Sequence, residues 1–261
     1  MIGIFDSGLG GLTVARAIMD ELPGYDITYF GDTARTPYGA KSAGTVEKYA
    51  LEDIDFLLSK GARVIVMACN SASSVVTEPV IRTLPVPVFE VISPAVVLAA
   101  EYSRSGRIGV IGTRATINSN IYKTKILEKR PRAKVFSAPC PLLVPLVEEG
   151  WINKPETAMI IKKYLRPLKM QQIDTLILGC THYPILKKII ARKIGARTFA
   201  IDSSTAVARS VRTHFEAHPE IEETVSKNGR TAFYVSDMTA QFRETAQMIL
   251  KRKVTLEPVS L

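Results

Sequence analysis

The chain has 261 residues, of which 46% are hydrophobic and 23% are charged, and this composition is typical of a globular protein with either one large core or two smaller ones. An apolar region near residues 86–100 is interrupted by Glu90, Ser93 and Pro94, and a strand pattern begins directly after Met1, so we expect neither a membrane span nor a leader peptide. Three cysteines, an odd number, fit a reducing cytoplasm better than a disulfide framework.

The net charge of +9 is unevenly distributed. Residues 93–206 hold 19 Lys and Arg against 7 Asp and Glu, whereas the rest of the chain holds 15 against 18. The basic residues lie on predicted helices, and neither an aromatic-interleaved patch nor a nucleic-acid motif accompanies them. We interpret them as solvated helix faces that help to attract anionic substrates, and we expect no specific nucleic-acid partner and no membrane partner.

Apolar runs alternate with helical patterns along the chain. The predicted strands cover residues 2–5, 26–30, 63–68, 86–89, 107–111, 134–138, 174–179, 197–201 and 231–236. The predicted helices cover residues 12–22, 45–59, 72–83, 94–104, 115–129, 156–168, 185–194, 204–217 and 239–251. This alternation with short links predicts an α/β fold with parallel, helix-covered sheets. Ser93 and Pro94 form a predicted helix start, with Ser93 as the N-cap.

The first turn, residues 6–11, is rich in glycine. Its backbone N–H groups can approach an anion at a helix start, and a carboxylate would be held as well as a phosphate. The turn matches neither the dinucleotide nor the nucleoside triphosphate motif. Because the carboxylate of Asp6 would repel an anion, it must have another task, such as orienting an ammonium group or a catalytic thiol.

A second polar turn, residues 31–39, follows the predicted strand 26–30 at the same end of the sheet. Its Pro37-Tyr38-Gly39 segment has turn chemistry and either only shapes a loop or holds backbone amides and a tyrosine hydroxyl over the cleft. Arg35 and Asp32 are close enough in sequence simply to pair with each other.

Two cysteines each follow an apolar strand pattern. Cys180 ends the run 175–179, with His182 two residues later and Pro184 opening an amphipathic helix, so a helix amino terminus would favour its thiolate. Cys69 ends the run 64–68 in the same way. A buried hydrophobe is the commoner fate of a single free cysteine. Two such turns, however, aim two thiols at the ligand end of a parallel sheet.

The chain also contains a weak internal repeat. Residues 108–114 resemble residues 2–8 in sequence. The number of residues between these two segments is nearly the same as the number between the two cysteines. The sequence therefore predicts two similar domains, residues 1–92 plus 207–261 and residues 93–206. Facing each other, they would place the thiols on opposite walls of one cleft.

Further polar residues lie in the second half. Thr113 and Thr116 follow the strand 107–111 at a helix start, where their hydroxyls either cap the helix or bind a carboxylate, and capping is the simpler interpretation. Cys140 stands between two prolines away from any strand end, and we interpret it as structural. Glu148 and Glu149 follow an apolar run, and we expect one of them to point inward.

Two thiols without a cofactor motif suit the inversion of a stereocentre next to a carboxylate. One base removes the Cα proton from one face, and an acid on the opposite face returns a proton. The pKa of a free thiol is about 8.5 and falls beside a helix amino terminus or an imidazolium, toward the range where acid–base catalysis is efficient. Hydrogen bonds from the N–H-rich turns would stabilise the carbanion.

Five motifs resemble, in order and over nearly the whole chain, those of the glutamate racemases. They are Asp6-Ser7-Gly8-x-Gly10-Gly11, Gly31-Asp32-Thr33-x-x-x-Pro37-Tyr38-Gly39, Ala68-Cys69-Asn70-Ser71-Ala72, Pro145-Leu146-Val147-Glu148 and Gly179-Cys180-Thr181-His182-Tyr183-Pro184. The resemblance implies two α/β domains related by a pseudo-twofold axis, with the active site between them. It also implies a cofactor-independent, two-base racemase that makes D-glutamate for peptidoglycan.

The resemblance implies roles for single residues as well. The cysteine that matches Cys69 takes the proton from D-glutamate, and the one that matches Cys180 takes it from L-glutamate. The other implied catalytic residues are Asp6 as support for Cys69, His182 as support for Cys180, and Asp32 and Glu148 as auxiliary acids. The positions that match substrate contacts are Asp6, Ser7, Tyr38, Gly39, Asn70, Ser71, Thr113, Thr116, Thr181 and His182. No metal ligand is implied, and a homodimer is expected by analogy.

Two departures from the family pattern stand out. Position 71 is Ser where the family usually has Thr, which keeps the hydroxyl and loses a methyl contact, so affinity is affected rather than reaction type. The chain starts at the first strand, without the extension that some members use with a cell-wall precursor activator, and we expect no such activation.

Four alternatives are left open by the sequence. They are an aspartate racemase with the same paired thiols, a Cys–His hydrolase that needs only one of them, a zinc site that lacks an evident fourth ligand, and a non-catalytic binding protein for an acidic amino acid.

Overall fold

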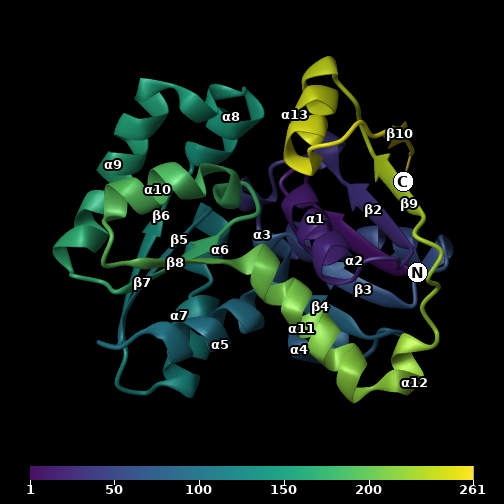
Figure 1. Cartoon of the computed structure of the whole chain (residues 1–261), viewed down its shortest axis with the longest axis horizontal. Helices are drawn as coiled ribbons and strands as arrows, with labels where there is room; N and C mark the ends of the chain where they lie inside the picture. Colours follow the sequence, from purple (N-terminus) through teal and green to yellow (C-terminus); the bar gives the residue numbers. More distant parts are fainter. Residues whose placement is uncertain (261) are drawn as a thin grey trace.

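The computed structural model describes residues 1–260 and contains two separate β-sheets, each flanked by helices (Figure 1). All neighbouring strands in both sheets are parallel. In Figure 1 the second sheet lies in the teal half on the left, and the first sheet lies with both chain ends in the half on the right. The expected fold class, two open parallel α/β units, is confirmed.

The two sheets share a strand order. The first sheet has the order β10–β9–β2–β1–β3–β4 and the second has the order β6–β5–β7–β8. The strands of the first sheet are β1 (Ile2–Asp6), β2 (Ile27–Gly31), β3 (Val64–Met67), β4 (Val88–Glu90), β9 (Thr231–Val235) and β10 (Glu257–Pro258). Those of the second are β5 (Arg107–Gly112), β6 (Lys134–Pro139), β7 (Thr175–Gly179) and β8 (Phe199–Asp202). In each half the first strand lies between the second and the third, with the fourth beside the third, so the topology repeats as the sequence repeat predicts.

Helices surround both sheets. The α-helices are α1 (Leu12–Glu21), α2 (Ala43–Ser59), α3 (Asn70–Ser73), α4 (Glu78–Ile81), α5 (Ile92–Tyr102), α6 (Arg114–Asn118), α7 (Ile121–Lys129), α8 (Leu143–Glu148), α9 (Pro155–Met170), α10 (Lys187–Ile194), α11 (Ser203–Ala217), α12 (Pro219–Glu222) and α13 (Ala240–Leu250). The 3₁₀ helices are η1 (Thr33–Arg35), η2 (Tyr38–Ala40), η3 (Trp151–Asn153) and η4 (Tyr183–Leu186). Within residues 1–260, none of these helices has both the length and the apolar composition needed to cross a bilayer.

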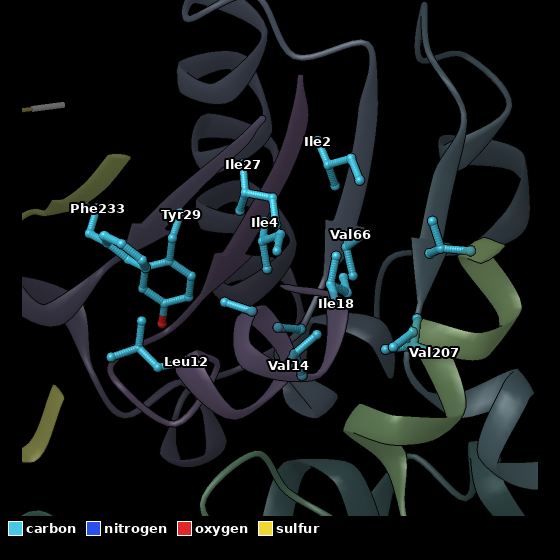
Figure 2. Close-up of a cluster of buried hydrophobic side chains, with 14 of the residues drawn as sticks. Ile2, Ile4, Leu12, Val14, Ile18, Ile27, Tyr29, Val66, Val207 and Phe233 are labelled. Atoms are coloured by element: carbon cyan, nitrogen blue, oxygen red, sulfur yellow. The ribbon is translucent and has the colours of Figure 1, made fainter. Parts of the chain in front are cut away.

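The core of the first half draws on both ends of the chain. Figure 2 shows Ile4 of β1 and Val66 of β3 packed against Ile18 of α1, and these side chains are fully buried. Val207 of α11 and Phe233 of β9 belong to the same cluster. Because helices cover both faces of a parallel sheet, its strands are apolar on both sides, and each large aliphatic side chain buried there contributes roughly 1.5–3 kcal/mol.

α11 links the two halves. It packs against α1 in the first half and against α5 in the second, and Figure 1 shows it as the light green helix that runs between them. Residue 207, the expected domain boundary, therefore lies inside a continuous helix.

Some local predictions are wrong. The predicted helices 72–83 and 115–129 are each broken into two, and the second break is at Asn120, whose φ of 56° is left-handed. Helix α8 was not predicted, although its Pro145 stands in the first turn, where proline is tolerated. The short edge strand β10 was also not predicted.

The predicted N-cap at Ser93 is wrong as well. α5 begins at Ile92, and the carboxylate of Glu90 accepts hydrogen bonds from the backbone N–H groups of Ile92 and Ser93, the latter at 2.9 Å. The Ser93 hydroxyl instead accepts from Nζ of Lys125 at 2.9 Å. A carboxylate three residues upstream thus replaces the expected hydroxyl as the helix cap.

Replacing Glu90 by Ala should lower the free energy of unfolding by about 1 kcal/mol, since two N–H groups of α5 lose their acceptor. Glu90→Gln, which keeps an acceptor oxygen, should lose less, and Ser93→Ala should change stability by less than about 0.5 kcal/mol. Urea denaturation followed by circular dichroism measures the three variants. A Ser93→Ala effect as large as that of Glu90→Ala would contradict this assignment of the cap.

Candidate active site

The carboxyl ends of the two sheets border one small cavity. Its volume is about 20 Å³, which is room for about one water molecule. The lining residues are Ser7, Thr36, Pro37, Tyr38, Gly39, Cys69, Asn70, Ser71, Thr113, Val144, Cys180, Thr181 and His182. Cys69 follows β3 and Cys180 follows β7, which are the third strands of their halves. The repeated topology therefore brings the two thiols to equivalent positions on a shared cavity.

The thiol of Cys69 is in a hydrophobic and anionic environment. The residue is 4% exposed, and its Sγ lies 3.4 Å from Oγ of Ser7, to which it donates. Burial and then the nearby carboxylate of Asp6 raise the pKa of Cys69 to about 12. The expectation of a lowered thiol pKa is thus wrong for Cys69. The helix that follows it, α3, has only four residues, and its amino-terminal charge does not outweigh burial.

The thiol of Cys180 faces an imidazole. Its Sγ lies 3.8 Å from Nδ1 of His182, and Nε2 of His182 lies 3.1 Å from Oε1 of Glu148. Burial lowers the pKa of His182, but the hydrogen bonds to Cys180 and Glu148 outweigh burial and raise this pKa well above its usual value. The raised pKa favours the protonated form of His182, whose ring is held between a sulfur and a carboxylate.

The helix expected directly after Cys180 starts later than predicted. Residues 183–186 form the 3₁₀ helix η4, and the α-helix α10 begins only at Lys187. The charge that faces Cys180 is therefore that of the His182 side chain rather than that of a helix amino terminus.

The carboxylate of Asp6 is fully buried between the halves. Its Oδ2 accepts from the N–H of Gly8 at 3.1 Å, and its Oδ1 accepts from the hydroxyl of Thr181 at 3.2 Å. Burial raises the pKa of Asp6, and the neighbouring His182 opposes that rise. Asp6 does not line the cavity, so it acts on Cys69 through its charge and not through a hydrogen bond.

Hydroxyl groups from both halves form a short chain along the wall. Oγ of Ser71 lies 3.0 Å from Oγ1 of Thr113, which lies 3.1 Å from Oγ1 of Thr116. Thr113 also caps α6 by accepting from the N–H of Thr116, so capping is confirmed for Thr113, whereas the hydroxyl of Thr116 contacts that of Thr113. Position 39 has room only for glycine, because a Cβ there would lie 2.5 Å from Cβ of Thr113.

Asn70 presents an amide oxygen without a partner. Its Nδ2 donates to the hydroxyl of Tyr122 at 2.8 Å, across the boundary between the halves. Its Oδ1 is buried and accepts no hydrogen bond from residues 1–260. A buried acceptor of this kind on a cavity wall suits a ligand donor such as an ammonium group.

Asp32 and the hydroxyl of Tyr38 are directed away from the thiols. Nε of Arg35 lies 2.6 Å from Oδ2 of Asp32, so the two residues pair, and Asp32 does not line the cavity. The Tyr38 hydroxyl contacts the buried carboxyl groups of Asp32 and Asp53. Tyr38 thus borders the cavity while its hydroxyl is held by residues behind it.

Sequence reasoning missed four residues around the site. Thr36 and Val144 line the cavity, Tyr122 holds Asn70, and Asp53 holds Tyr38. Thr36 occupies an unspecified position inside the recognised motif of residues 31–39 and could have been included with it. The others lie on helices α2, α7 and α8, and no local pattern distinguishes them from core residues.

Size alone does not identify the site. A hollow of about 530 Å³ lies between α1, α10 and α13, and its lining contains neither cysteine nor histidine. In residues 1–260 no group of three or more His, Cys, Asp and Glu side chains is arranged to hold a metal ion. The lining of the small cavity also contains no Lys or Arg, so an anionic ligand would be held there by N–H groups and hydroxyls.

The fold and the site together define a class of protein, namely paired α/β units that each contribute one thiol to a common cavity. The family described as Asp/Glu/Hydantoin racemase matches residues 13–211. The glutamate racemase of Syntrophus aciditrophicus is 42% identical over 254 residues, which are 97% of this chain and 93% of that protein. The glutamate racemase of Geobacter metallireducens is 44% identical over 253 residues, with the same coverage. The chain belongs to the Asp/Glu racemase family, which confirms the resemblance.

Solved structures are similar over the whole chain. Glutamate racemase isoform RacE1 from Bacillus anthracis has a TM-score of 0.93 at 34% identity and covers 100% of this chain and 97% of its own. The Francisella tularensis glutamate racemase in complex with D-glutamate has a TM-score of 0.90 at 38% identity. It covers 99% of this chain and 97% of its own. An aspartate racemase from Picrophilus torridus, 19% identical with a TM-score of 0.57 over 82% of this chain and 93% of its own, shares the fold.

Replacing Glu148 by Gln should lower the pKa of His182, because the imidazolium loses the carboxylate that stabilises it. Since folding raises this pKa, the stability that the protonated imidazole contributes is complete below about pH 6.5 and is lost as the pH rises through the folded value. An NMR titration of the histidine ring carbons measures the shift, with the exposed Glu149→Gln as the matched control. An unchanged His182 titration in Glu148→Gln would contradict this coupling.

Proposed function

We propose that this chain is a cofactor-independent glutamate racemase, an isomerase that interconverts L- and D-glutamate by a two-base mechanism. The observation that carries the proposal is that Cys69 and Cys180 follow equivalent strands of two repeated sheets and line the same cavity. High identity to glutamate racemases over nearly the full length supports the choice of substrate.

The two thiols would start each reaction in different protonation states. Cys180, which faces the imidazole of His182, would act as the base on L-glutamate, and Cys69, whose pKa is about 12, would be the thiol. The Cys180 thiolate would take the Cα proton of L-glutamate, and Cys69 would donate its proton to the opposite face. The product is D-glutamate with the protonation states exchanged, so the reverse reaction starts from Cys69.

Hydrogen bonds from the cavity wall would hold the substrate. The hydroxyls of Ser7, Ser71, Thr113 and Thr181 and the N–H groups of the Pro37–Gly39 turn suit its two carboxylates, and these bonds would strengthen as the carbanion forms. The unpartnered Oδ1 of Asn70 suits the ammonium group. Thr116 would act through Thr113, which it contacts.

The remaining side chains would position the thiols and the wall. Asp6 would keep Cys69 protonated until turnover, and Glu148 would keep His182 charged beside Cys180. Asp32 would hold the 36–39 turn through Tyr38 rather than touch the substrate.

The cavity must widen for glutamate to enter, because its present volume accommodates about one water molecule. We propose that the units which move are residues 1–92 plus 207–261 and residues 93–206. α11 packs on both and would be the element on which they turn.

In the cell the enzyme would supply D-glutamate for peptidoglycan. We expect a cytoplasmic homodimer whose partner besides itself is the small-molecule substrate, with no specific nucleic-acid partner and no membrane partner. The location of the basic residues on predicted helix faces and the family resemblance support this expectation.

One alternative has a specific observation in its favour. The Cys180–His182–Glu148 chain has the order of a nucleophile, a base and an orienting acid, as in Cys–His hydrolases. That mechanism, however, needs only one thiol and gives no role to the second cysteine on the same cavity. An aspartate racemase shares the thiols and differs in the substrate it accepts.

Incubating the protein with L-glutamate in D₂O should place deuterium at Cα as D-glutamate forms, since a solvent-exchanging thiol supplies the new proton. Proton NMR with chiral analysis measures both events, and L-aspartate run in parallel should react far more slowly. L-glutamate that keeps its Cα proton would refute the proposal, and faster turnover of aspartate would redirect it to the other racemase.

Cys69→Ser and Cys180→Ser should each lower racemisation by at least about 10³-fold, because a serine hydroxyl is a much weaker acid than a thiol. Cys140→Ser is the matched control: Cys140 is buried beside the second sheet, does not line the cavity, and should leave most activity intact. Polarimetry measures the three rates. Full racemisation by Cys69→Ser would contradict the two-base mechanism, because that reaction needs a thiol on each face of Cα.

A further inference from the structure

A second cluster of ionisable side chains lies behind the 36–39 turn. Asp32, Tyr38 and Asp53 are each completely buried there, and Arg35 lies between the two carboxylates. Proton transfer at Cα uses none of these groups. Asp53 lies on α2, whose sequence has the apolar periodicity of an ordinary amphipathic helix. The sequence alone therefore does not indicate a function for Asp53.

The hydrogen bonds of this cluster do not balance unless it holds an extra proton. The Tyr38 hydroxyl contacts Oδ2 of Asp32 and lies 2.9 Å from Oδ2 of Asp53. A phenol has one proton and can donate to only one of these oxygens. If both carboxylates were charged, the other contact would place two oxygens together with no hydrogen between them. One of the two carboxyl groups must therefore be protonated.

The distribution of donors indicates which group is charged. Asp32 accepts from Nε of Arg35 at 2.6 Å, from the hydroxyl of Ser236 at 2.8 Å and from Tyr38. Asp53 has Nη2 of Arg35 at 3.1 Å on one oxygen and only the shared phenol on the other. More and shorter donors favour the anion at Asp32, which leaves the proton on Asp53.

The charges around Asp53 agree with this assignment. The groups that face it or its neighbours are Asp32 and Tyr29 of the β2 segment, Arg35 of η1, Tyr38 of η2, Glu52, Tyr49 and Lys48 of α2, Lys41 before α2, and Asp6 and Cys69 at the ends of β1 and β3. The half-buried cation Arg35 is shared, because it pairs with Asp32 and Glu52 as well as with Asp53. Burial and then repulsion from Asp32 raise the pKa of Asp53 well above its usual value.

The cluster is joined to the substrate cavity by the turn. Thr36, Pro37, Tyr38 and Gly39 all line that cavity. The Tyr38 hydroxyl is tied to the cluster, and Gly39 is pressed against Thr113 of the other half. A change in the hydrogen bonds of Tyr38 would therefore displace a wall of the cavity.

We propose that Asp53 is a protonated positioning residue that donates to the Tyr38 oxygen while Tyr38 donates to Asp32, and that this chain holds the 36–39 turn in its substrate-binding form. This inference rests on the proposed function and adds a hydrogen-bond chain that supports the binding of glutamate. Loss of the Asp53 proton to solvent at alkaline pH breaks the chain, leaves two anions around one phenol, and weakens binding of a dicarboxylate.

The kinetic test compares KM and kcat for L-glutamate across neutral and alkaline pH. Asp53→Asn carries an amide that can donate to Tyr38 and cannot ionise, so it should bind substrate as the wild type does at neutral pH. At alkaline pH its KM should stay on the order of tenfold below that of the wild type, the effect expected for one buried, charge-assisted hydrogen bond. The ratio of kcat values should change little, because Asp53 does not touch the reacting atoms.

Two further variants separate positioning from folding. Asp53→Ala should raise KM at every pH if it folds, as judged by circular dichroism. Tyr38→Phe removes the shared hydroxyl, and adding Asp53→Asn to it should then leave the pH dependence of KM unchanged. Asp55→Asn, an exposed carboxylate on the same helix, is the matched control and should behave as the wild type.

A spectroscopic measurement does not depend on racemisation. The infrared difference spectrum of wild type minus Asp53→Asn at neutral pH should contain the carbonyl band of a protonated carboxyl, and wild type minus Asp55→Asn should not. Absence of that band, or an Asp53→Asn variant whose KM follows the wild-type alkaline rise, would overturn the inference. If the wild type failed to exchange the Cα proton while the band was present, the proposed function would fail and the protonation of Asp53 would stand.

Discussion

The rest of the structure depends on the meeting of two parallel sheets at their carboxyl ends. All strands of a parallel sheet point the same way, so the polar turns that follow them collect at one edge. Hydrogen bonds from Ser71 to Thr113 and from Thr181 to Asp6 then join the edges of the two halves. Cys69 and Cys180 border a common cavity because each follows the third strand of its half, at the carboxyl end of the sheet.

The two thiols occupy equivalent positions in unlike surroundings. Cys69 is buried near Asp6, and its pKa is raised to about 12, whereas Cys180 faces an imidazole whose pKa is raised well above its usual value. A symmetric pair would have no preferred starting state, and a reaction that removes a proton on one face and adds one on the other needs a base and an acid at the same moment. The difference between the two environments therefore suits one thiol to act as the base and the other as the acid.

The carboxyl groups near this cavity are either paired with a basic side chain or have a raised pKa. A site for a dicarboxylate with no Lys or Arg on its wall cannot tolerate many anions nearby. Asp6 has a raised pKa, Glu148 is neutralised by His182, and Asp32 is neutralised by Arg35. Asp53 shares Arg35 with Asp32, and burial raises the pKa of Asp53 well above its usual value.

The sequence by itself determined the alternation of strands and helices, the repeat, and the two thiols at strand ends, because each of these is a pattern of neighbours along the chain. It failed where residues distant in the sequence decide: the Ser93 hydroxyl accepts from Lys125, burial raises the pKa of Cys69, and the Tyr38 hydroxyl turns toward Asp53. Only the tertiary structure sets desolvation, charge pairing and the direction of a hydroxyl, since these depend on groups that are brought together by packing.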